Sequence, residues 1–383
     1  MSVWDDVVGQ PDAVATLRRA ATDPAAMTHA WLVTGPPGSG RSVAARAFAA
    51  ALQCTGSGGV TGGCGRCLAC TTTLAGTHPD LTVVATDKVV IAIEEVRSLI
   101  MTAARTPSTG RYRVIVVEDA DRMAERTTNV LLKAIEEPPP HTVWVLCAPS
   151  AQDVLPTIRS RCRGVVLRVP PAPDVADLLV RRDGIDADVA LAAARAAQSH
   201  VGLARRLARD PEARERRGAV LEIAQRIRGV GDAVLAAGEL VEVSKAEATS
   251  ATAERDAVER AELMRGLGVQ EGDTLPPRLR SQVKQLEDDQ KRRATRRQRD
   301  VLDRSMVDLL SLYRDVLVVQ LGATVDLVNV EHAAAVRTLA ADSTPEQTIR
   351  RMDAIGVARE RLEGNVAPLL AVEAMTVALR PQG

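Results

Sequence analysis

The sequence predicts an α/β domain with a buried parallel sheet, followed by two helical segments, and three observations support this. Four apolar runs typical of strands alternate with helical stretches, and they lie at 30–35, 80–86, 112–119 and 142–149. Each run is apolar throughout instead of alternating, which indicates strands buried on both faces and hence parallel pairing. After about residue 209 the chain is rich in Ala, Leu, Arg and Glu, with helical periodicity and almost no strand signal.

Two joints divide the chain into three expected domains. VPPAPD at 169–174 ends the α/β region, and DPEARERR at 210–217 follows a short helical segment. Proline- and charge-rich stretches of this kind are typical of domain boundaries. The expected domains are an α/β domain at 1–168, a small helical lid at 169–212, and a helical domain at 213–383 that contains an expected loop at 266–280.

Composition excludes several function classes for these 383 residues. Lys plus Arg and Asp plus Glu both number 49, so no net charge draws the chain toward nucleic acid or a membrane. Aromatic residues are only 2%, which argues against gripping single strands by base stacking. The start, MSVWDDVVGQ, is not an export signal, and no apolar run approaches a membrane span. Six cysteines, four of them clustered, suit a reducing cytoplasm and a metal site better than a disulfide framework.

The stretch VTGPPGSGRS has the spacing of a phosphate-binding loop, G-x-x-x-x-G-K-[ST], between a predicted strand and a predicted helix. Gly35, Gly38 and Gly40 let the backbone N–H groups form an anion cradle, and Ser42 stands where a hydroxyl would bind Mg²⁺. Arg41 replaces the lysine, and its broad guanidinium cannot occupy the place of an ammonium between two phosphates. We expect a degenerate loop. Whether it still holds ATP stays open, as does a glycine-rich turn without nucleotide.

A second altered motif ends the third apolar run, VIVVEDAD. An active ATPase of this type ends that strand in Asp-Glu, where Asp orders the metal and Glu polarises the attacking water. Here the order is Glu118-Asp119, so each carboxylate is displaced by one methylene, about 1 Å, a misplacement that can reduce a rate about a hundredfold. The alternative is an acidic strand end that caps a neighbouring helix. Together with Arg41, the pair predicts a disabled ATPase.

A cysteine cluster predicts a structural zinc site. The spacing is C-x9-C-x2-C-x2-C, and the ligands are Cys54, Cys64, Cys67 and Cys70. Four thiolates complete a tetrahedral shell and leave no open position for water, so the site is structural rather than catalytic. The alternatives are unrelated cysteines, a redox pair or an iron–sulfur cluster. Cys147 and Cys162 are expected to be ordinary buried thiols.

The loop, the cysteine cluster, GTHPDL (76–81), NVLLKAIEEPP (129–139) and TIRSRC (157–162) occur together in this order. This combination resembles the bacterial clamp-loader family, the AAA+ subunits of the DNA polymerase III holoenzyme. The resemblance covers about 210 residues with specific motifs and the remainder only by helical character. It implies an AAA+ fold with a zinc module at about 54–80, and a C-terminal collar that joins loader subunits into a ring.

Four departures from the family's motor branch, gamma/tau, each remove a nucleotide contact and resemble the delta prime branch. They are Arg41, the pair Glu118-Asp119, Ala148-Pro149 where a polar residue would sense the γ-phosphate, and Gly202 near the place of a lid arginine. The resemblance implies a structural subunit with little ATP turnover of its own. Its partners would be the motor and delta subunits and, through the complex, the sliding clamp and primed DNA.

One motif is intact, Ser160-Arg161-Cys162. In the family this arginine reaches across a subunit interface as an arginine finger, which stabilises charge on a phosphoryl group held by the neighbour. The alternative is a surface arginine beside a strand. For the whole chain, the alternatives are an active motor-type ATPase and a zinc-dependent nucleic-acid binder. The basic run at 291–299 is expected to be a charged helix face, because acidic residues flank it on both sides within 287–304.

Overall fold

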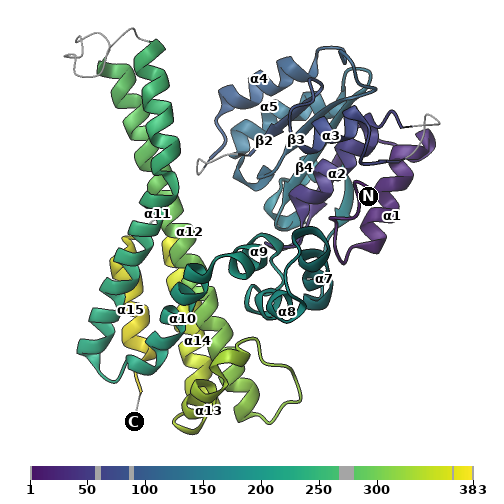
Figure 1. Ribbon diagram of the computed structural model, residues 1–383. Helices are drawn as coiled ribbons and strands as arrows, with labels where there is room; N and C mark the ends of the chain where they lie inside the picture. The colour runs from purple at the N-terminus through teal and green to yellow at the C-terminus, as the bar shows by residue number, and fades with distance from the viewer. Residues whose placement is uncertain (1, 57–61, 86–89, 267–279, 365, 382–383) are drawn as a thin grey trace. The chain divides into compact units, whose positions relative to one another are not determined.

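The computed structural model describes residues 2–56, 62–85, 90–266, 280–364 and 366–381. They form two compact units, Met1–Arg209 and Asp210–Gly383, which Figure 1 draws in one picture. We describe each unit by itself. The expected loop at 266–280 falls almost wholly outside the described residues, and the division into three domains stays a prediction.

The first unit contains a five-stranded parallel sheet with the order β2-β3-β4-β1-β5. The strands are β1 (Ala30–Thr34), β2 (Leu81–Val84), β3 (Arg113–Val117), β4 (Thr142–Ala148) and β5 (Arg163–Val166). The four apolar runs therefore became four parallel strands, and the predicted α/β class is confirmed. The sequence did not reveal β5, because this short edge strand exposes three of its four residues and lacks a continuous apolar signal.

Helices cover both faces of the sheet (Figure 1). They are α1 (Pro11–Thr22), α2 (Arg41–Gln53), α3 (Leu68–Leu74), α4 (Ile93–Ala103), α5 (Glu125–Glu136) and α6 (Pro156–Arg159), with short 3-10 turns at Pro24–Ala26, Ala120–Arg122 and Ala151–Asp153. Successive strand residues point to opposite faces. On β1, Trp31 and Val33 pack in the core with Phe48 of α2, whereas Leu32 packs in the core with Leu131 of α5. Two apolar cores therefore explain the uninterrupted apolar runs.

Three further helices complete the first unit in the segment expected to be a lid. They are α7 (Ala172–Asp183), α8 (Ala187–Ala196) and α9 (Val201–Arg209). The Asp183 carboxylate, whose side chain is 2% exposed, pairs with Arg205 at 2.8 Å and Arg209 at 3.2 Å. These charge-assisted bonds join the end of α7 to α9.

All the regular secondary structure among the described residues of the second unit is helical. Its helices are α10 (Pro211–Arg226), α11 (Val230–Gly266), α12 (Arg280–Gln320), α13 (Ala333–Ala341), α14 (Pro345–Glu363) and α15 (Pro368–Leu379), with a 3-10 turn at Val330–His332. Leu221, Leu309, Tyr313 and Ile355 lie in its apolar core. No helix among the described residues is both long and apolar enough to cross a membrane.

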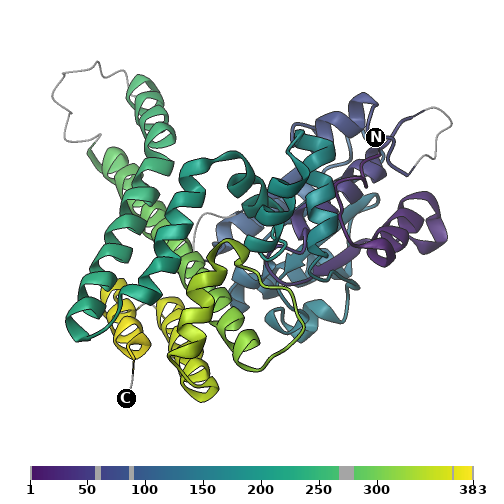
Figure 2. The same ribbon diagram turned by 60° about the horizontal axis from the view of Figure 1, so that its bottom comes forward.

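The basic run at 291–299 lies within α12, as the helix prediction expects. Figures 1 and 2 show α11 and α12 side by side as two long helices. In this part of the pair, Arg293 binds Asp256 at 2.9 Å and Glu259 at 2.5 Å across the two helices. Hydrogen bonds and ion pairs with these carboxylates also raise the pKa of Arg293. At least this arginine therefore joins two helices and is not free for DNA.

Candidate functional site

The predicted phosphate loop connects the end of β1 to the start of α2. Gly40 caps α2 with a φ of 87°, and Gly38 also has a φ of 87°. These left-handed conformations favour glycine, so the backbone itself requires two glycines of the motif. A Cβ on Gly38 would lie 3.0 Å from both Cα and Cβ of His200. The segment that precedes α9 therefore packs directly against the loop.

Arg41 folds back onto the loop to which it belongs. Its Nη1 donates a hydrogen bond to the main-chain carbonyl of Gly35, in a partly buried contact. Ser42 is half-buried in the first turn of α2. The lysine of an intact motif reaches the phosphates, whereas this guanidinium is engaged by the loop's own carbonyl. The backbone of the phosphate loop is therefore formed, but the guanidinium of Arg41 is bound by a carbonyl of the same loop.

Gln10 fastens the loop to the edge of the sheet and was not predicted. Its side chain is buried, and its Nε2 donates to the carbonyls of Ser39 at 3.3 Å and Arg168 at 2.5 Å. Its Oε1 accepts a hydrogen bond from the main-chain N–H of Arg168 at 3.1 Å. These partners lie 29 and 158 residues away, so no local pattern could reveal the role.

The acidic end of β3 is neutralised by arginines of the same chain. Arg46 on α2 donates from Nε at 3.0 Å and from Nη2 at 2.8 Å to Oε1 of Glu118. Asp119 lies 3.7 Å from Nε of Arg122. A carboxylate that already accepts two charge-assisted hydrogen bonds is a poor base for activating water. Arg46 was not predicted, since its partner is 72 residues distant.

Two places correspond to the expected γ-phosphate sensors, the end of β4 and the first turn of α9. They present main-chain groups or side chains that are already bound within the chain. At the end of β4, the carbonyls of Ala148 and Pro149 lie 3.3 and 3.2 Å from the main-chain N–H of the first loop glycine. Gly202 lies in the first turn of α9, and Arg205, one turn later, is held by Asp183 at 2.8 Å. At the end of β4 the groups near the loop are therefore main-chain carbonyls, and at α9 the nearby arginine is already bound by Asp183.

Arg161 lies between α6 and β5, and its side chain is 38% exposed. Its Nη2 lies 2.5 Å from Oε1 of Glu136, the last residue of α5. Its Nη1 donates to the carbonyl of Thr157 at 2.8 Å and to Oγ of Ser160 at 3.2 Å. The structure thus joins two sequence motifs, TIRSRC and NVLLKAIEEPP, through one ion pair. Glu136, with 40% of its side chain exposed, is the ion-pair partner of this arginine.

The four clustered cysteines come together as the spacing predicts. They are Cys54, Cys64, Cys67 and Cys70, whose Sγ atoms all lie within 4.8 Å of one another. A tetrahedral zinc with Zn–S bonds of about 2.3 Å holds its sulfurs about 3.8 Å apart, so the cluster fits one such ion. The N–H groups of Cys64 and Cys67 point at the preceding cluster sulfurs, at 3.3 and 3.4 Å. Such bonds orient thiolate ligands.

Burial raises the pKa of three of the cysteine thiols. Burial raises the pKa of Cys70 well above its usual value, and a coordinated cation is what would keep such a thiol ionised. Burial also raises the pKa values of Cys147 and Cys162 to about 12. These two are therefore inert, as expected of ordinary buried thiols.

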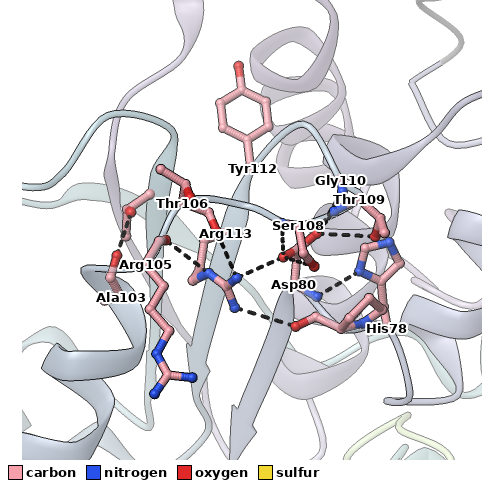
Figure 3. Close-up of polar contacts among 12 residues, drawn as sticks. His78, Asp80, Ala103, Arg105, Thr106, Ser108, Thr109, Gly110, Tyr112 and Arg113 are labelled. Carbon is pink, nitrogen blue, oxygen red and sulfur yellow. Dashed lines mark hydrogen bonds and ion pairs between the residues drawn. The ribbon is translucent and has the colours of Figure 1, made fainter.

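GTHPDL forms a buried polar cluster beside the sheet (Figure 3). The Asp80 carboxylate is fully buried and binds Nη2 of Arg113 at 2.9 Å. It also accepts hydrogen bonds from the main-chain N–H groups of Ser108, Thr109 and Gly110 at 2.7, 2.8 and 2.6 Å. Nδ1 of His78 accepts from the N–H of Asp80 at 3.1 Å, which shapes the turn before β2. This cluster fixes the start of β2 and β3.

Replacing Asp80 with alanine is expected to lower the free energy of unfolding by about 3 kcal/mol or more, because Arg113 loses its buried partner. Burial alone would raise the pKa of Asp80, but the hydrogen bonds from Ser108, Gly110 and Thr109 outweigh it and lower the pKa below its usual range. Its stabilisation is therefore full above the unfolded pKa of about 3.9 and is lost as the pH falls toward the folded value. Urea unfolding at several pH values between 6 and 3 measures this.

The matched control is Asp12→Ala, since its carboxylate is 86% exposed and pairs with Arg168 at 3.1 Å on the surface. We expect this change to stay within about 0.5 kcal/mol. The difference between wild type and Asp80→Ala should shrink as the pH drops. An Asp80→Ala variant as stable as wild type at pH 6 would contradict the structural role of the cluster.

Residues 9–171 match the family model described as "DNA polymerase III, delta subunit". This part of the chain is similar to the DNA polymerase III clamp-loader family. A 155-residue stretch is 36% identical to DNA polymerase III subunit delta' of Pseudomonas aeruginosa and covers 40% of this chain and 47% of that protein. A 190-residue stretch is 33% identical to DNA polymerase III subunit gamma/tau of Mycobacterium tuberculosis and covers 49% of this chain and 32% of that protein.

The clamp-loader similarity is confined to part of each protein, since the chain spans less than half the length of these two relatives. Among solved structures, a DNA polymerase III gamma subunit-related protein from Thermotoga maritima aligns over 96% of this chain and 99% of that one, with 18% identity and a TM-score of 0.43. The clamp-loader relatives include both delta' and gamma/tau, so the choice between them depends on the residues of the site.

Proposed function

We propose that the chain is a delta prime subunit of a bacterial DNA polymerase III clamp loader. In this role it holds the motor and delta subunits in a gapped ring, so that the sliding clamp opens and closes on primed DNA in the cytoplasm. It does not hydrolyse ATP but presents Arg161 to ATP bound by a neighbouring motor subunit. Two contacts within the chain's own nucleotide site carry this proposal. The guanidinium of Arg41 donates to the carbonyl of Gly35 in the phosphate loop, and the guanidinium of Arg46 donates to Glu118 at the acidic end of β3.

The first support is electrostatic. ATP hydrolysis needs a cation on the γ-phosphate and an unoccupied carboxylate near the attacking water. Arg41 instead donates to Gly35, and Glu118 accepts from Arg46 at 2.8 and 3.0 Å. Reversing either contact would leave a partly buried charged group without its partner, which is unfavourable. The site is thus stabilised in a form that does not require nucleotide.

The second support concerns the arginine finger. The ion pair of Arg161 with Glu136 is well exposed, at 38% and 40% of the two side chains, and exposed pairs contribute only about 0–1 kcal/mol. Glu136 can therefore hold the guanidinium near one orientation in the separate subunit and release it at small cost. A phosphate then replaces the carboxylate, because both match the planar fork of donors.

The cysteine cluster has a structural part in this proposal. A zinc ion held by four cysteines would join the end of α2 to the start of α3. It would supply no reaction, since the four thiolates complete its coordination.

Co-purification of the chain with motor and delta subunits is the direct test of partnership, and failure to form a complex would reject the proposal.

The purified chain is expected to hydrolyse ATP no faster than buffer alone, and Glu118→Ala should leave that rate unchanged. The reason is that Glu118 is already bound by Arg46. Steady-state phosphate release, with a motor subunit as positive control, measures this.

The second candidate function is a motor-type ATPase, which the similarity to gamma/tau favours. Steady hydrolysis that Glu118→Ala abolishes would establish that candidate instead. Salt-dependent DNA binding by the chain alone would favour a nucleic-acid binder.

A further inference from the structure

The segment before α1, residues 2–10, contacts both the cysteine cluster and the expected lid, and we call it the N-terminal strap. It consists of turns. Its buried apolar side chains lie in the core that also contains Cys70, and they are Val3, Trp4 and Val7. The other three clustered cysteines pack against the same core. The strap and the metal site therefore share one packing environment.

The first residues of the strap are bound by the two glycines that precede the second cysteine of the cluster. Nε1 of Trp4, a residue that is 4% exposed, donates to the carbonyl of Gly62 at 2.6 Å. The carbonyl of Gly63 accepts from the main-chain N–H of Val3 at 3.2 Å and from Oγ of Ser2 at 3.0 Å. A Cβ on Gly63 would overlap Cγ2 of Val3, so this close approach depends on glycine.

The metal site determines where these two carbonyls lie. Nine residues separate Cys54 from Cys64, and five of them are glycine. Glycine loses more backbone entropy on ordering than any other residue, so a loop of this composition is costly to close. An ion bound by cysteines at both ends closes the loop and fixes Gly63 next to the ligand Cys64. Without the ion, the acceptors that bind the start of the strap are no longer held in place.

The middle of the strap is bound by α7 of the expected lid. Nη2 of Arg181 donates to the main-chain carbonyl of Asp5 at 3.0 Å. Nη1 of Arg182 lies 3.8 Å from the carboxylate of Asp6. Nη2 of Arg182 also binds Asp183 at 3.2 Å, the carboxylate that joins α7 to α9. The strap therefore contacts the end of α7 from which the lid helices are connected.

The last residues of the strap fasten the joint that leads into α7. Gly9 has a φ of 66°, and a Cβ at this position would lie 2.8 Å from Cβ of Pro170. Gln10 binds the main chain of Arg168 through both ends of its amide. Both contacts lie just before α7 begins at Ala172. One short segment thus connects the metal site to the beginning and to the end of α7.

We propose that metal occupancy at the four cysteines controls how firmly the expected lid is held, with the N-terminal strap as the connection. When the ion is bound, the carbonyls of Gly62 and Gly63 fix the start of the strap, and the strap holds α7. When the ion is lost, the strap is released at its first end, and α7 loses the partners that the strap supplies. This conformational role does not depend on the clamp-loader function.

The test is hydrogen–deuterium exchange of the full chain, read by mass spectrometry, with zinc bound and after removal of zinc by EDTA. Elemental analysis verifies the metal content of both forms. Removal should raise amide exchange in the strap and raise it in α7 about three- to tenfold, the scale of losing two partly exposed charged contacts. Helix α5 lies in the other apolar core and is the internal reference. Unchanged exchange in α7 of the metal-free chain overturns the proposal.

A double variant, Arg181→Gln with Asp6→Asn, separates the strap from a general loosening of the unit. It removes both contacts between the strap and the end of α7 but leaves Arg182 bound to Asp183. With zinc bound, exchange in α7 of this variant should approach that of metal-free wild type, and EDTA should add little. A full response of the double variant to EDTA would overturn the strap as the connection.

The matched control is Arg168→Gln, which removes a side chain that pairs with Asp12 on the surface outside the strap. It should respond to EDTA as wild type does. If EDTA unfolds the whole first unit, α5 exchanges as fast as α7, and Trp4→Phe with zinc bound then decides. This variant keeps an aromatic ring but removes the donor to Gly62. Faster exchange in α7 at unchanged zinc content supports the proposal, whereas wild-type exchange in both strap and α7 overturns it.

Discussion

Replacing Arg161 with alanine is expected to slow ATP hydrolysis at the neighbouring site of a reconstituted clamp loader by on the order of 10³-fold, the usual contribution of an arginine finger. The guanidinium is exposed and lies beside Glu136 at 2.5 Å, so its removal leaves no buried group unpaired. The fold and the assembly should both survive. Rapid-quench measurement of phosphate release, with clamp and primed DNA present, should show loss of the phase contributed by that site.

Three variants separate catalysis from structure in this experiment. Arg159→Ala removes an exposed arginine two residues away and should have no effect on hydrolysis. Arg161→Lys keeps the charge without the fork and should restore little of the rate. Glu136→Gln should change the rate only a few-fold, because an exposed ion pair is weak. Normal hydrolysis by a complex that contains Arg161→Ala would reject the arginine-finger role while leaving the partnership intact.

Replacing Cys67 with serine is expected to remove the metal and lower the free energy of unfolding by about 5 kcal/mol or more, since structural zinc sites in peptides gain about 10–16 kcal/mol from binding. The loss is large because the four sulfurs converge within 4.8 Å and cannot form an apolar core of their own. Elemental analysis should find one zinc per chain in wild type and none in the variant. Thermal unfolding should show a corresponding decrease in Tm.

Cys162→Ala is the matched control for the metal site. This thiol is free, lies outside the cluster, and has a pKa that burial raises to about 12. We expect unchanged zinc content and a loss of about 1 kcal/mol, as for a small change at a partly buried position. Visible absorbance typical of iron and sulfur would indicate a cluster instead of zinc. Equal stability of Cys67→Ser and wild type would contradict a structural metal.

Local patterns predicted the parts of this protein that short stretches of chain can specify. Continuous apolar runs predicted four buried strands, since parallel strands are covered on both faces. The glycine spacing predicted a loop whose Gly38 and Gly40 need a φ of 87°. The cysteine spacing predicted a cluster in which successive members are at most 10 positions apart along the chain. Edge strand β5 was missed, because exposure removes the apolar signal on which the prediction depends.

Tertiary structure alone decided the partners of the charged side chains. Arg46 and Glu118 are 72 residues apart, Asp80 and Arg113 are 33 apart, and Gln10 and Arg168 are 158 apart. Hydrogen bonding and ion pairing act over about 3 Å in space and leave no periodic trace along a chain. Sequence therefore determined which chemical groups this protein possesses and which backbone holds them. Folding determined that its own arginines bind the loop and the acidic strand end, and that Arg161 stays near the surface.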